Sequence, residues 1–406
     1  MAGSASGSWS NDGPASEGYR FRDDHSVLLR REPRSTSTDP LLLLPVCDGI
    51  AVLNHSHARR ARFAVDLAAA VGCRVLVLGT GGWARPQPWP GAPSAPAKAA
   101  AGSERHVVRL LWPAPWDGLF PARTLRQVAN EGLKYQDISA KRNLALAVAR
   151  MLGWRRLLFL DDDIRGLEPA DLHQPPVAEW GLTGQTAVAW ALQGFPDNSV
   201  VCHARREVGL DQGTFVGAGA LLVSVDRDVP FFPPVYNEDW LFFFDLLARD
   251  RPLRVVGEVQ QQPFDPFEFP RRAYEEEPGD ILAEGLFELL HHRESVERAL
   301  TRSYWTDVVA ERREMIRQLR RSASSRQAGC SGAEQVGWYH VLGSLAAAER
   351  HHDDTDLPAD LTSFVRAWRA DLDDWHDWFA GLPRDVPDLP TALRLLGISE
   401  EVLLPL

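Results

Sequence analysis

The chain has 406 residues, 45% of them of hydrophobic types, so it is long enough to bury one large core or two smaller ones. Its formal net charge of −11 argues against a nucleic acid or an anionic membrane as a partner, because both require a basic surface. No basic start precedes an apolar core, and the run LLLLPV at 41–46 is too short to span a bilayer. We therefore expect a cytoplasmic protein with no integral membrane segment.

Short apolar runs alternate with helical patterns in the first part of the chain, and they predict strands and helices in turn. In chain order these are a strand at 41–47, a helix at 58–72, strands at 74–79 and 106–112, a helix at 137–154 and a strand at 155–163. Strands that are apolar on both faces and separated by helices indicate an α/β fold with a mainly parallel sheet flanked by helices. In such a sheet, ligands bind beyond the carboxyl ends of the strands.

Composition divides the chain into four parts. Residues 1–38 are rich in Ser, Gly, Asp and Arg without periodicity, which is typical of a flexible tail. Residues 321–334 have the composition of a linker, so we expect an ordered domain at 39–320 and a helical C-terminal region at 335–406. The segment at 87–105, rich in Pro, Ala and Gly, is expected to be a loop.

Two further patterns concern the C-terminal helices and the cysteines. Residues 337–352 and 360–383 are amphipathic, and the second segment carries tryptophans on or near one face: Trp368, Trp375 and Trp378. The cysteines lie far apart without a C-x-x-C pair, which predicts buried or inert thiols and neither a disulfide framework nor a zinc site. They are Cys47, Cys73, Cys202 and Cys330.

Three carboxylates, Asp161, Asp162 and Asp163, follow the apolar run LLFL directly. If the segment is extended, Asp161 and Asp163 share one side and Asp162 faces the other. Two carboxylates 4 Å apart repel by roughly 4 kcal/mol at an effective dielectric near 20, so the site needs a proton, a basic side chain or a metal. A hard cation, Mg²⁺ or Mn²⁺, fits this chemistry, because it takes carboxylate oxygens and shares substrate phosphates. The alternative is a solvated turn or a helix cap.

An ordered set of motifs surrounds these acids. Residues 141–164 read KRNLALAVARMLGWRRLLFLDDDI, 211–226 read DQGTFVGAGALLVSVD, and 231–249 read FFPPVYNEDWLFFFDLLAR. The set resembles the RN-x-A helix, D-x-D strand, glycine-containing segment and E-D motif of nucleotide-sugar glycosyltransferases of the GT-A fold, family 2-like members in particular. The similarity covers 40–265 and implies a GT-A-like (Rossmann-like) domain. It also implies transfer of a sugar from a nucleotide-diphosphate donor to a hydroxyl acceptor, with inversion.

The resemblance assigns the donor side to the first motif. It implies that Asp161 and Asp163 hold the ribose and the metal-bound diphosphate and form the metal site, with Asp163 as the direct ligand. Asp162 plays a supporting part. The same motif contributes Lys141, Arg142 and Asn143 to donor binding, the first two against phosphate charge. A basic first turn of a helix is, however, more often a solvated face.

The same resemblance assigns the catalytic side to the second motif. Asp239 is the implied base that takes the acceptor proton, and Glu238 orients the acceptor or the base. Helix capping is the alternative, but two acids between the apolar runs FFPPVY and WLFFF would otherwise be costly. Trp240 completes the acceptor side together with Gly217 and Gly219, which fit either a strand that passes close to a ligand or a β-bulge.

One departure concerns the metal. Many metal-dependent members carry a histidine ligand after the E-D helix, whereas 255–270 here contains glutamines and no histidine. Either a glutamine among 260–262 or Asp265 substitutes, or Asp163 holds the metal with the diphosphate and water alone. His291 and His292 are neighbours in a helical stretch and do not share a face, so we expect surface or packing roles.

Three weaker candidates remain. The turn-like segment 194–206 carries Asp197, Asn198 and His203, which either contact a substrate or form a simple turn. The acidic run at 274–280 is expected to be a solvated loop and helix cap, or a lid over the acceptor. Trp240 and Trp305 are candidate platforms for a sugar ring.

Two other functions compete with the transferase. In haloacid-dehalogenase-like phosphatases an apolar strand also precedes a D-x-D-x-T/V motif, but Ile164 and Arg165 do not match it and no later G-D-x-x-x-D follows. The second alternative is a catalytically silent scaffold that binds a nucleotide sugar. Retention of both the acidic triplet and the pair Glu238 and Asp239 favours the enzyme.

Overall fold

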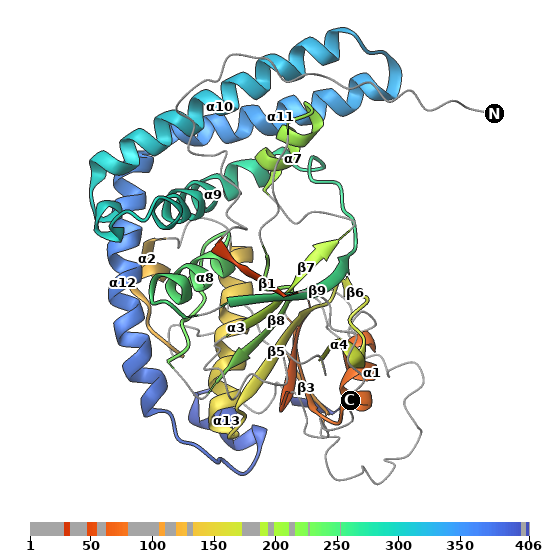
Figure 1. Cartoon of the computed structure of the whole chain (residues 1–406), viewed down its shortest axis with the longest axis vertical. Helices are drawn as coiled ribbons and strands as arrows, with labels where there is room; N and C mark the ends of the chain where they lie inside the picture. The colour runs from red at the N-terminus through yellow and green to blue at the C-terminus, as the bar shows by residue number, and fades with distance from the viewer. Residues whose placement is uncertain are drawn as a thin grey trace, which may run out of the picture.

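The computed structural model describes a central sheet, the helices that flank it and a set of C-terminal helices (Figure 1). The described residues are 28–32, 47–54, 62–79, 105–109, 119–127, 133–172, 187–193, 199–210, 216–225, 228–251, 253–398 and 403–405. Most of the expected tail at 1–38 and of the expected loop at 87–105 lies outside them. Residues 30–32 of that tail are a strand paired with the edge of the sheet.

Within these residues, ten strands form one mixed sheet in the order β1-β9-β7-β8-β5-β2-β3-β4-β10, with β6 paired to β9. The strands are β1 (Arg30–Glu32), β2 (Gly49–Asn54), β3 (Arg74–Gly79), β4 (Arg105–Arg109), β5 (Arg156–Asp161), β6 (Ile164–Arg165), β7 (Ala187–Gln193), β8 (Ala220–Ser224), β9 (Leu253–Gln261) and β10 (Leu403–Pro405). Neighbours pair in parallel from β5 through β4 and from β7 through β1. The α/β class with a mainly parallel sheet is therefore confirmed.

The antiparallel strand β8 brings the residues before it to the same edge of the sheet as the carboxyl ends of its neighbours. β8 lies between β5 and β7 and runs against both, with Leu160 opposite Ala220. The residues before β8 therefore share an edge with the carboxyl ends of β5, β7 and β9. Asp161, Gly219 and Gln261 all lie along this edge.

The strand predictions were accurate where the apolar run was short and uninterrupted. The expected strand at 74–79 is β3 without change, and the one at 155–163 begins one residue later and ends at Asp161. The first strand begins at Gly49, while 41–46 lie outside the described residues. Cys47 therefore precedes β2, because Gly49 is where pairing with β3 and β5 begins.

Helices cover both faces of the sheet and bury its apolar side chains in two layers. One face packs on α1 (Arg62–Val71) and α4 (Pro169–Leu172), and the other on α3 (Leu133–Met151), α8 (Glu238–Ala248) and α9 (Pro270–His291). The short helices α2 (Arg123–Gln127) and α7 (Val200–Glu207) complete this part. α3 begins four residues before the predicted helix and ends at Met151, just before Gly153, whose φ is 72°.

The C-terminal part is helical, as expected, and is joined to the sheet. It comprises η5 (Val296–Leu300), α10 (Arg302–Ala328), α11 (Gly332–Asp354), α12 (Leu357–Gly381) and α13 (Leu389–Leu395). Figure 1 shows α10 and α11 as a hairpin beyond α9, and α12 running back along the flank of the sheet domain. Trp368 and Trp375 of α12 are buried in the layer that also holds α3 and α8. Among the described helices, none has the length and apolar content needed to cross a membrane.

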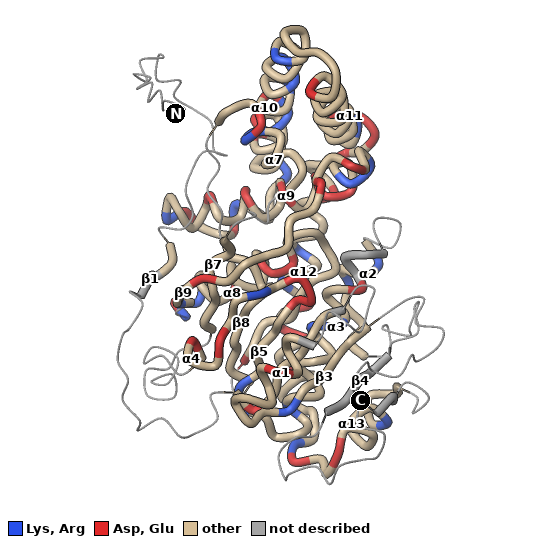
Figure 2. Tube along the Cα trace, turned by 90° about the vertical axis from the view of Figure 1, so that its right-hand side faces the viewer, with Lys and Arg blue, Asp and Glu red and all other residues tan. Residues whose placement is uncertain are grey.

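The expected linker at 321–334 is largely helical, which corrects the prediction. α10 continues to Ala328 and α11 begins at Gly332, so only the turn between the two helices has no helical structure. Ala323 is buried against α11, and Glu349 of α11 pairs with Arg317 and Arg320. Figure 2 shows acidic and basic residues on both helices of this hairpin. The Ser and Arg residues that suggested a linker therefore lie mainly on the exposed face of a helix.

The acidic run at 274–280 is buried inside α9 and is not a solvated loop or a lid. Glu276, Glu277 and Asp280 are all nearly inaccessible to solvent. Arg312 of α10 lies between Glu277 and Asp280, and His352 of α11 contacts Glu277. The run is buried because its counter-charges come from helices distant in the sequence.

The cysteines are free thiols, as expected. Cys47 and Cys73, just before the adjacent strands β2 and β3, have their sulfurs 3.4 Å apart. The contact with Cys73, together with burial, raises the pKa of the Cys47 thiol well above its ordinary value. A thiol held in this way is a weak nucleophile.

Candidate functional site

The two acidic motifs meet through Arg142, which projects from α3 at the carboxyl edge of the sheet. Its Nη2 donates to Asp161 at the end of β5, at 3.1 Å to Oδ2 and 3.3 Å to Oδ1. Its Nη1 donates to Oε1 of Glu238 in the first turn of α8, 96 residues away in the chain. The Arg142 side chain is 4% exposed. One buried cation therefore joins the D-D-D strand to the N-E-D helix.

This pairing corrects the role predicted for Arg142. Neither a solvated helix face nor a free phosphate ligand describes it, because both sides of the guanidinium are occupied by the protein's own carboxylates. Burial lowers the pKa of Arg142, but the charges of Asp161 and Glu238 outweigh this and raise it above its ordinary value. Arg142 remains charged throughout the physiological range.

Glu238 is the acid of this group whose charged form is disfavoured by its surroundings. Burial raises the pKa of Glu238 to about 8; the charge of Arg142 opposes the shift, whereas the charges of Asp239 and Asp161 add to it. Three acids share one arginine at this place, so the local charge is negative when all are ionised. A site with this excess of negative charge favours the arrival of a cation.

Asp239 is held by backbone N–H groups in an orientation toward the turn before β8. Its Oδ2 accepts from Ala218 N at 2.8 Å, and its Oδ1 accepts from Trp240 N at 2.9 Å. Both bonds fix the direction of the side chain. The residue is partly exposed, unlike Glu238, which is 6% exposed. Of the two predicted catalytic acids, Asp239 is thus the one that solvent can reach.

Gly217 and Gly219 were expected within a strand and lie instead in the turn that leads into β8. The Gly219 carbonyl accepts from Asp161 N at 2.9 Å. A Cβ at Gly219 would lie 3.2 Å from Ile164 Cδ1 and 3.6 Å from Asp161 Oδ2. The absence of a side chain therefore lets this turn run close beside the Asp161 carboxylate.

Asp163 lies beside the glutamines of 260–262, the segment in which the resemblance led us to expect a histidine ligand. Gln261 Nε2 donates to Asp163 Oδ2 at 3.3 Å, and Gln262 N donates to the Asp163 carbonyl at 3.1 Å. The short strand β6 fixes this register by pairing Ile164 with Gln261. Asp265 accepts instead from Phe267 N at 2.9 Å. Of the substitutes considered from the sequence, Gln261 is the one in contact with Asp163.

Gln261 also carries an orphaned polar atom. Its Oε1 is buried and has no hydrogen-bond partner among the described residues. The oxygen and nitrogen of a side-chain amide are nearly the same size, so a half-turn brings Oε1 toward Asp163 without new space. A carboxylate and an amide oxygen form a donor set that suits Mg²⁺ or Mn²⁺.

The alternation expected for the triplet holds although the strand ends early. β5 stops at Asp161, and Asp162 and Asp163 form a turn before β6. Asp162 is 3% exposed, whereas Asp161 and Asp163 remain partly exposed. Asp162 is therefore buried, whereas the other two remain accessible at the edge.

Lys141 and Asn143 make contacts within the protein. The Lys141 side chain is fully buried and its Nζ lies 2.9 Å from Asp137 one turn earlier. Asn143 exchanges two hydrogen bonds with the backbone of Phe232, both 2.8 Å. The contacts of Asn143 position the segment before α8, so its predicted donor contact is corrected to a structural role, and the same holds for the buried Lys141.

Other candidates from the sequence make contacts within the protein. Trp240 packs against Phe287 of α9 at a centroid distance of 5.1 Å, and Trp305 is fully buried with its indole N–H donating to the Ala299 carbonyl. His203 lies in helix α7, not in a loop, and burial lowers its pKa to about 4, as do the charges of Arg206 and Arg272. Asp197 and Asn198 lie outside the described residues.

His291 and His292 lie at the C-terminal end of α9, in the packing and surface roles expected. His292 pairs with Glu288 one turn earlier at 3.1 Å, and the two imidazole rings are 5.1 Å apart. Neither residue is among those that surround Asp161 and Asp163.

The sequence did not reveal what holds the segment 228–237 in front of α8. Asn143 binds it at Phe232, Ser139 donates to the Pro233 carbonyl at 2.7 Å, and Trp375 donates to the Val229 carbonyl at 2.8 Å. The structure buries 229–235 without interruption. The apolar run FFPP at 231–234 is the one feature of the sequence that indicates this burial.

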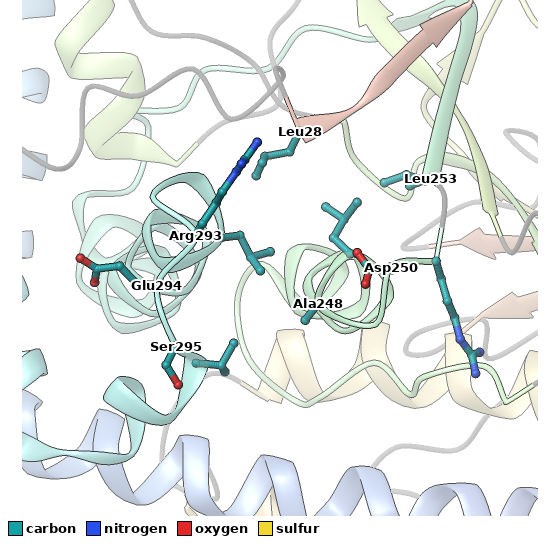
Figure 3. Close-up of a pocket in the computed structure, with 11 residues that line it drawn as sticks. Leu28, Ala248, Asp250, Leu253, Arg293, Glu294 and Ser295 are labelled. Atoms are coloured by element: carbon teal, nitrogen blue, oxygen red, sulfur yellow. The ribbon is translucent and has the colours of Figure 1, made fainter.

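A cavity of about 630 Å³ lies at the opposite end of α8 (Figure 3). Its walls come from the end of α8, the start of β9 and the end of α9, and Figure 3 shows Asp250, Leu253 and Arg293 around it. Because Leu253 begins β9 and Gln261 ends it, this cavity is at the other edge of the sheet from the acidic group. It is therefore separate from the candidate site.

No family model matches the sequence, and no curated protein matches it significantly. Among solved structures, glucosyl-3-phosphoglycerate synthase from Mycobacterium tuberculosis, in complex with Mn²⁺, UDP-glucose and phosphoglyceric acid, is 15% identical over 63% of this chain and 88% of that chain, with a TM-score of 0.37. Mannosyl-3-phosphoglycerate synthase from Rubrobacter xylanophilus is also 15% identical, over 60% and 74% of the two chains, with a TM-score of 0.34. At these scores the similarity does not by itself establish a shared fold or activity.

Proposed function

We propose that this chain is a metal-dependent glycosyltransferase with a GT-A-like catalytic domain, which moves a sugar from a nucleotide-diphosphate sugar to a hydroxyl acceptor. The observation that carries the proposal is the contact of Arg142 with both Asp161 and Glu238. It brings two motifs that resemble the donor and acceptor motifs of one enzyme family to one edge of the sheet. If either motif had occurred by chance, the two motifs would have no reason to lie at the same edge.

The donor side is formed by Asp161 and Asp163. Asp163 and Gln261 would hold the metal, because they are in contact at 3.3 Å and Gln261 Oε1 lacks a partner among the described residues. Asp161 is already paired with Arg142, so we place it beside the ribose and diphosphate and give it a lesser part in holding the metal. When bound, Mg²⁺ or Mn²⁺ would offset the charge of the departing nucleoside diphosphate.

The acceptor side is formed by Asp239, with Gly217 and Trp240 beside it. Asp239 takes the proton of the acceptor hydroxyl as the oxygen of that hydroxyl bonds to the anomeric carbon. The bond between that carbon and the diphosphate breaks at the same time, and the nucleoside diphosphate leaves with its electron pair. Attack from the face opposite the diphosphate gives inversion, and Arg142 keeps Glu238 beside the base during the reaction.

The direct test is release of nucleoside diphosphate from a panel of UDP-, GDP- and ADP-sugars with Mg²⁺ or Mn²⁺. We expect metal-dependent release from at least one donor by the wild-type chain, and none from Asp239→Asn. No turnover together with metal-dependent donor binding would favour the silent scaffold. Hydrolysis of a phosphomonoester would favour the phosphatase, and either result would overturn the transferase.

The metal assignment has a test that does not depend on turnover. Titration of Mn²⁺ followed by electron paramagnetic resonance should show one site in the wild-type chain and a roughly 10-fold or greater loss of affinity in Asp163→Asn. Gln261→Ala should weaken binding, and Gln261→His should preserve it. Gln260→Ala is the matched control, because Gln260 is a neighbouring exposed glutamine of β9. Equal affinities of Gln261→Ala and the wild type would remove Gln261 from the metal site.

A further inference from the structure

A buried polar network fastens the C-terminal hairpin to α9. Arg312 of α10 donates from Nε and Nη2 to Glu277, at 3.0 Å each, and also from Nη2 to Asp280. His352 of α11 contacts Glu277 at 2.9 Å, and Ser199, just before α7, donates to Asp280 at 2.7 Å. The Arg312 side chain is 1% exposed. Four helices therefore converge on one buried cation and two carboxylates.

The same Asp280 reaches the residue that precedes the catalytic pair. Its Oδ1 accepts from Asn237 Nδ2 at 3.3 Å. Asn237 has a φ of 62° and caps α8 without a side-chain bond to that helix. An asparagine tolerates this left-handed conformation better than most residues, but at some cost in free energy. The start of α8 is therefore fixed from outside the helix, by Asp280.

Gly279 lets α9 come close enough for this contact. A Cβ at position 279 would overlap the Tyr236 carbonyl oxygen and lie 2.8 Å from the Tyr236 Cβ. The neighbouring Pro278 lies inside α9, where it has no backbone N–H to donate to the preceding turn of the helix. Gly279 supplies the room and Asp280 the hydrogen bond at consecutive positions, both directed at 236–237.

We propose that the C-terminal helices position Glu238 and Asp239 through this chain of contacts, in which Arg312 fixes Asp280 and Asp280 fixes Asn237. Arg312, Asp280 and Asn237 are then positioning residues for the transfer reaction, and the inference rests on the proposed function. None of them touches substrate in this assignment. Their effect is on the direction in which α8 presents its first turn.

A metal is the competing explanation for the acids at this place. Cys202, Asp280 and Glu284 have ligand atoms within 4.8 Å of one another, and among the described residues no other trio with such spacing occurs. Asp280, however, already engages Arg312, Ser199 and Asn237. The guanidinium occupies the position of the counter-charge that a cation would supply, so we assign this cluster to positioning.

The variant that tests the proposal is Asn237→Gly, because glycine adopts a φ of 62° freely and removes only the contact with Asp280. The matched control is Asp250→Gly, at the other end of α8, where the φ is 54° and the side chain lies beside the cavity of Figure 3. Both changes relieve a left-handed residue next to the same helix. They differ in whether the contact with Asp280 is lost.

We expect Asn237→Gly to lower kcat by about 10- to 100-fold with a less than roughly twofold change in the KM of the donor. Asp250→Gly should leave both parameters unchanged. Gly279→Ala, which displaces Tyr236, should lower kcat in the same way, and its effect should add little to that of Asn237→Gly. A kcat of Asn237→Gly within twofold of the control would overturn the inference.

Amide hydrogen exchange provides a readout that does not require activity. The Leu241 N–H donates to the Asn237 carbonyl at 3.2 Å, so it reports on the first turn of α8. Its protection should fall about tenfold in Asn237→Gly and stay constant in Asp250→Gly. If no donor is turned over by the wild-type chain, the proposed function fails, and this measurement still decides the positioning role. Unchanged protection in Asn237→Gly would refute that role.

Discussion

Two buried arginines, Arg142 and Arg312, each bridge a pair of carboxylates, and the two settings are built for different purposes. Around Arg312 the partners Glu277 and Asp280 are 1% and 6% exposed in their side chains, and every one of them is held by a second helix. Around Arg142 the partner Asp161 is 23% exposed. The closed bridge fastens helices together, whereas the open bridge leaves one carboxylate at an edge where a ligand can bind.

The pKa values of Glu277 and Glu238 shift in opposite directions, whereas burial raises the pKa of Asp280 to about 6 although Arg312 opposes the shift. Burial alone would raise the pKa of Glu277, but the charge of Arg312 and the hydrogen bond from His352 lower it to about 2. Burial raises the pKa of Glu238 to about 8 even though Arg142 opposes the shift. The charged form of Glu277 is therefore stabilised in the fold, whereas the charged form of Glu238 carries a cost that a ligand can relieve.

The largest expected effect is at the closed bridge. Arg312→Ala should lower the free energy of unfolding by about 3–5 kcal/mol, because it leaves two buried carboxylates without a counter-charge. Urea unfolding followed by circular dichroism measures the change. Arg313→Ala is the control, since Arg313 pairs with Asp353 at the surface and should cost less than about 1 kcal/mol. Equal midpoints for the two variants would contradict this account of Arg312.

At the open bridge the largest effect is on turnover. Asp239→Asn should reduce kcat by about 10²–10⁴-fold, because the base is lost. The amide oxygen can keep one of the two backbone hydrogen bonds, whereas the amide nitrogen cannot accept the other. Donor binding, measured by isothermal titration calorimetry, should stay nearly intact. Asp163→Asn should instead abolish metal-dependent donor binding. Activity of both variants near the wild-type level would show that the site has been assigned to the wrong residues.

Glu238 should make stability depend on pH in a direction opposite to most carboxylates. A pKa raised to about 8 means that the native state holds the proton more tightly than the unfolded state does. The contribution is fully present below the ordinary pKa of about 4.5 and is lost as the pH rises through 8. Between pH 5.5 and 7.0 it should fall by about 2 kcal/mol in the wild type and not in Glu238→Gln. Parallel stability curves for the two proteins would exclude the shift.

The smallest expected effect concerns the turn that contacts the open bridge. Gly219→Ala places a methyl group 3.2 Å from Ile164 and 3.6 Å from Asp161, so it should cost about 1 kcal/mol of stability and disturb the donor side. Gly337→Ala in α11 meets nothing within 4 Å and should instead stabilise by up to about 1 kcal/mol. Thermal unfolding of both variants gives the signs, and a stabilising Gly219→Ala would be the contrary result.

The local pattern of residues was enough to predict much of the sheet and the site. β3 and the approach to Asp161 were predicted because uninterrupted apolar runs between helical patterns have few other solutions. The acids of the site were also predicted, since they follow or begin such elements. The part played by Arg142 was not, because one of its partners is 96 residues away and a helical pattern gives only the face of a residue.

Two segments were misassigned because composition does not show which groups a charged residue contacts. The run at 274–280 was expected in solvent and the segment at 321–334 in a linker, because composition registers charge but not its partner. In the first segment Arg312 and His352 supply those partners from other helices, whereas in the second Arg321 pairs with Glu314 of the same helix. A charged segment whose counter-charges arrive from a distant part of the chain cannot be told from a solvated one by its own residues.

The path of α12 along the sheet domain has a consequence for how this protein is divided. Trp375 binds the Val229 carbonyl, and Asp371 accepts from the backbone N–H groups of Arg123 and Thr124, at 2.8 and 2.9 Å. A chain shortened after α9 would keep every residue of the candidate site and lose the partners of its buried acids. We therefore expect the sheet part and the helical part to fold together as one unit.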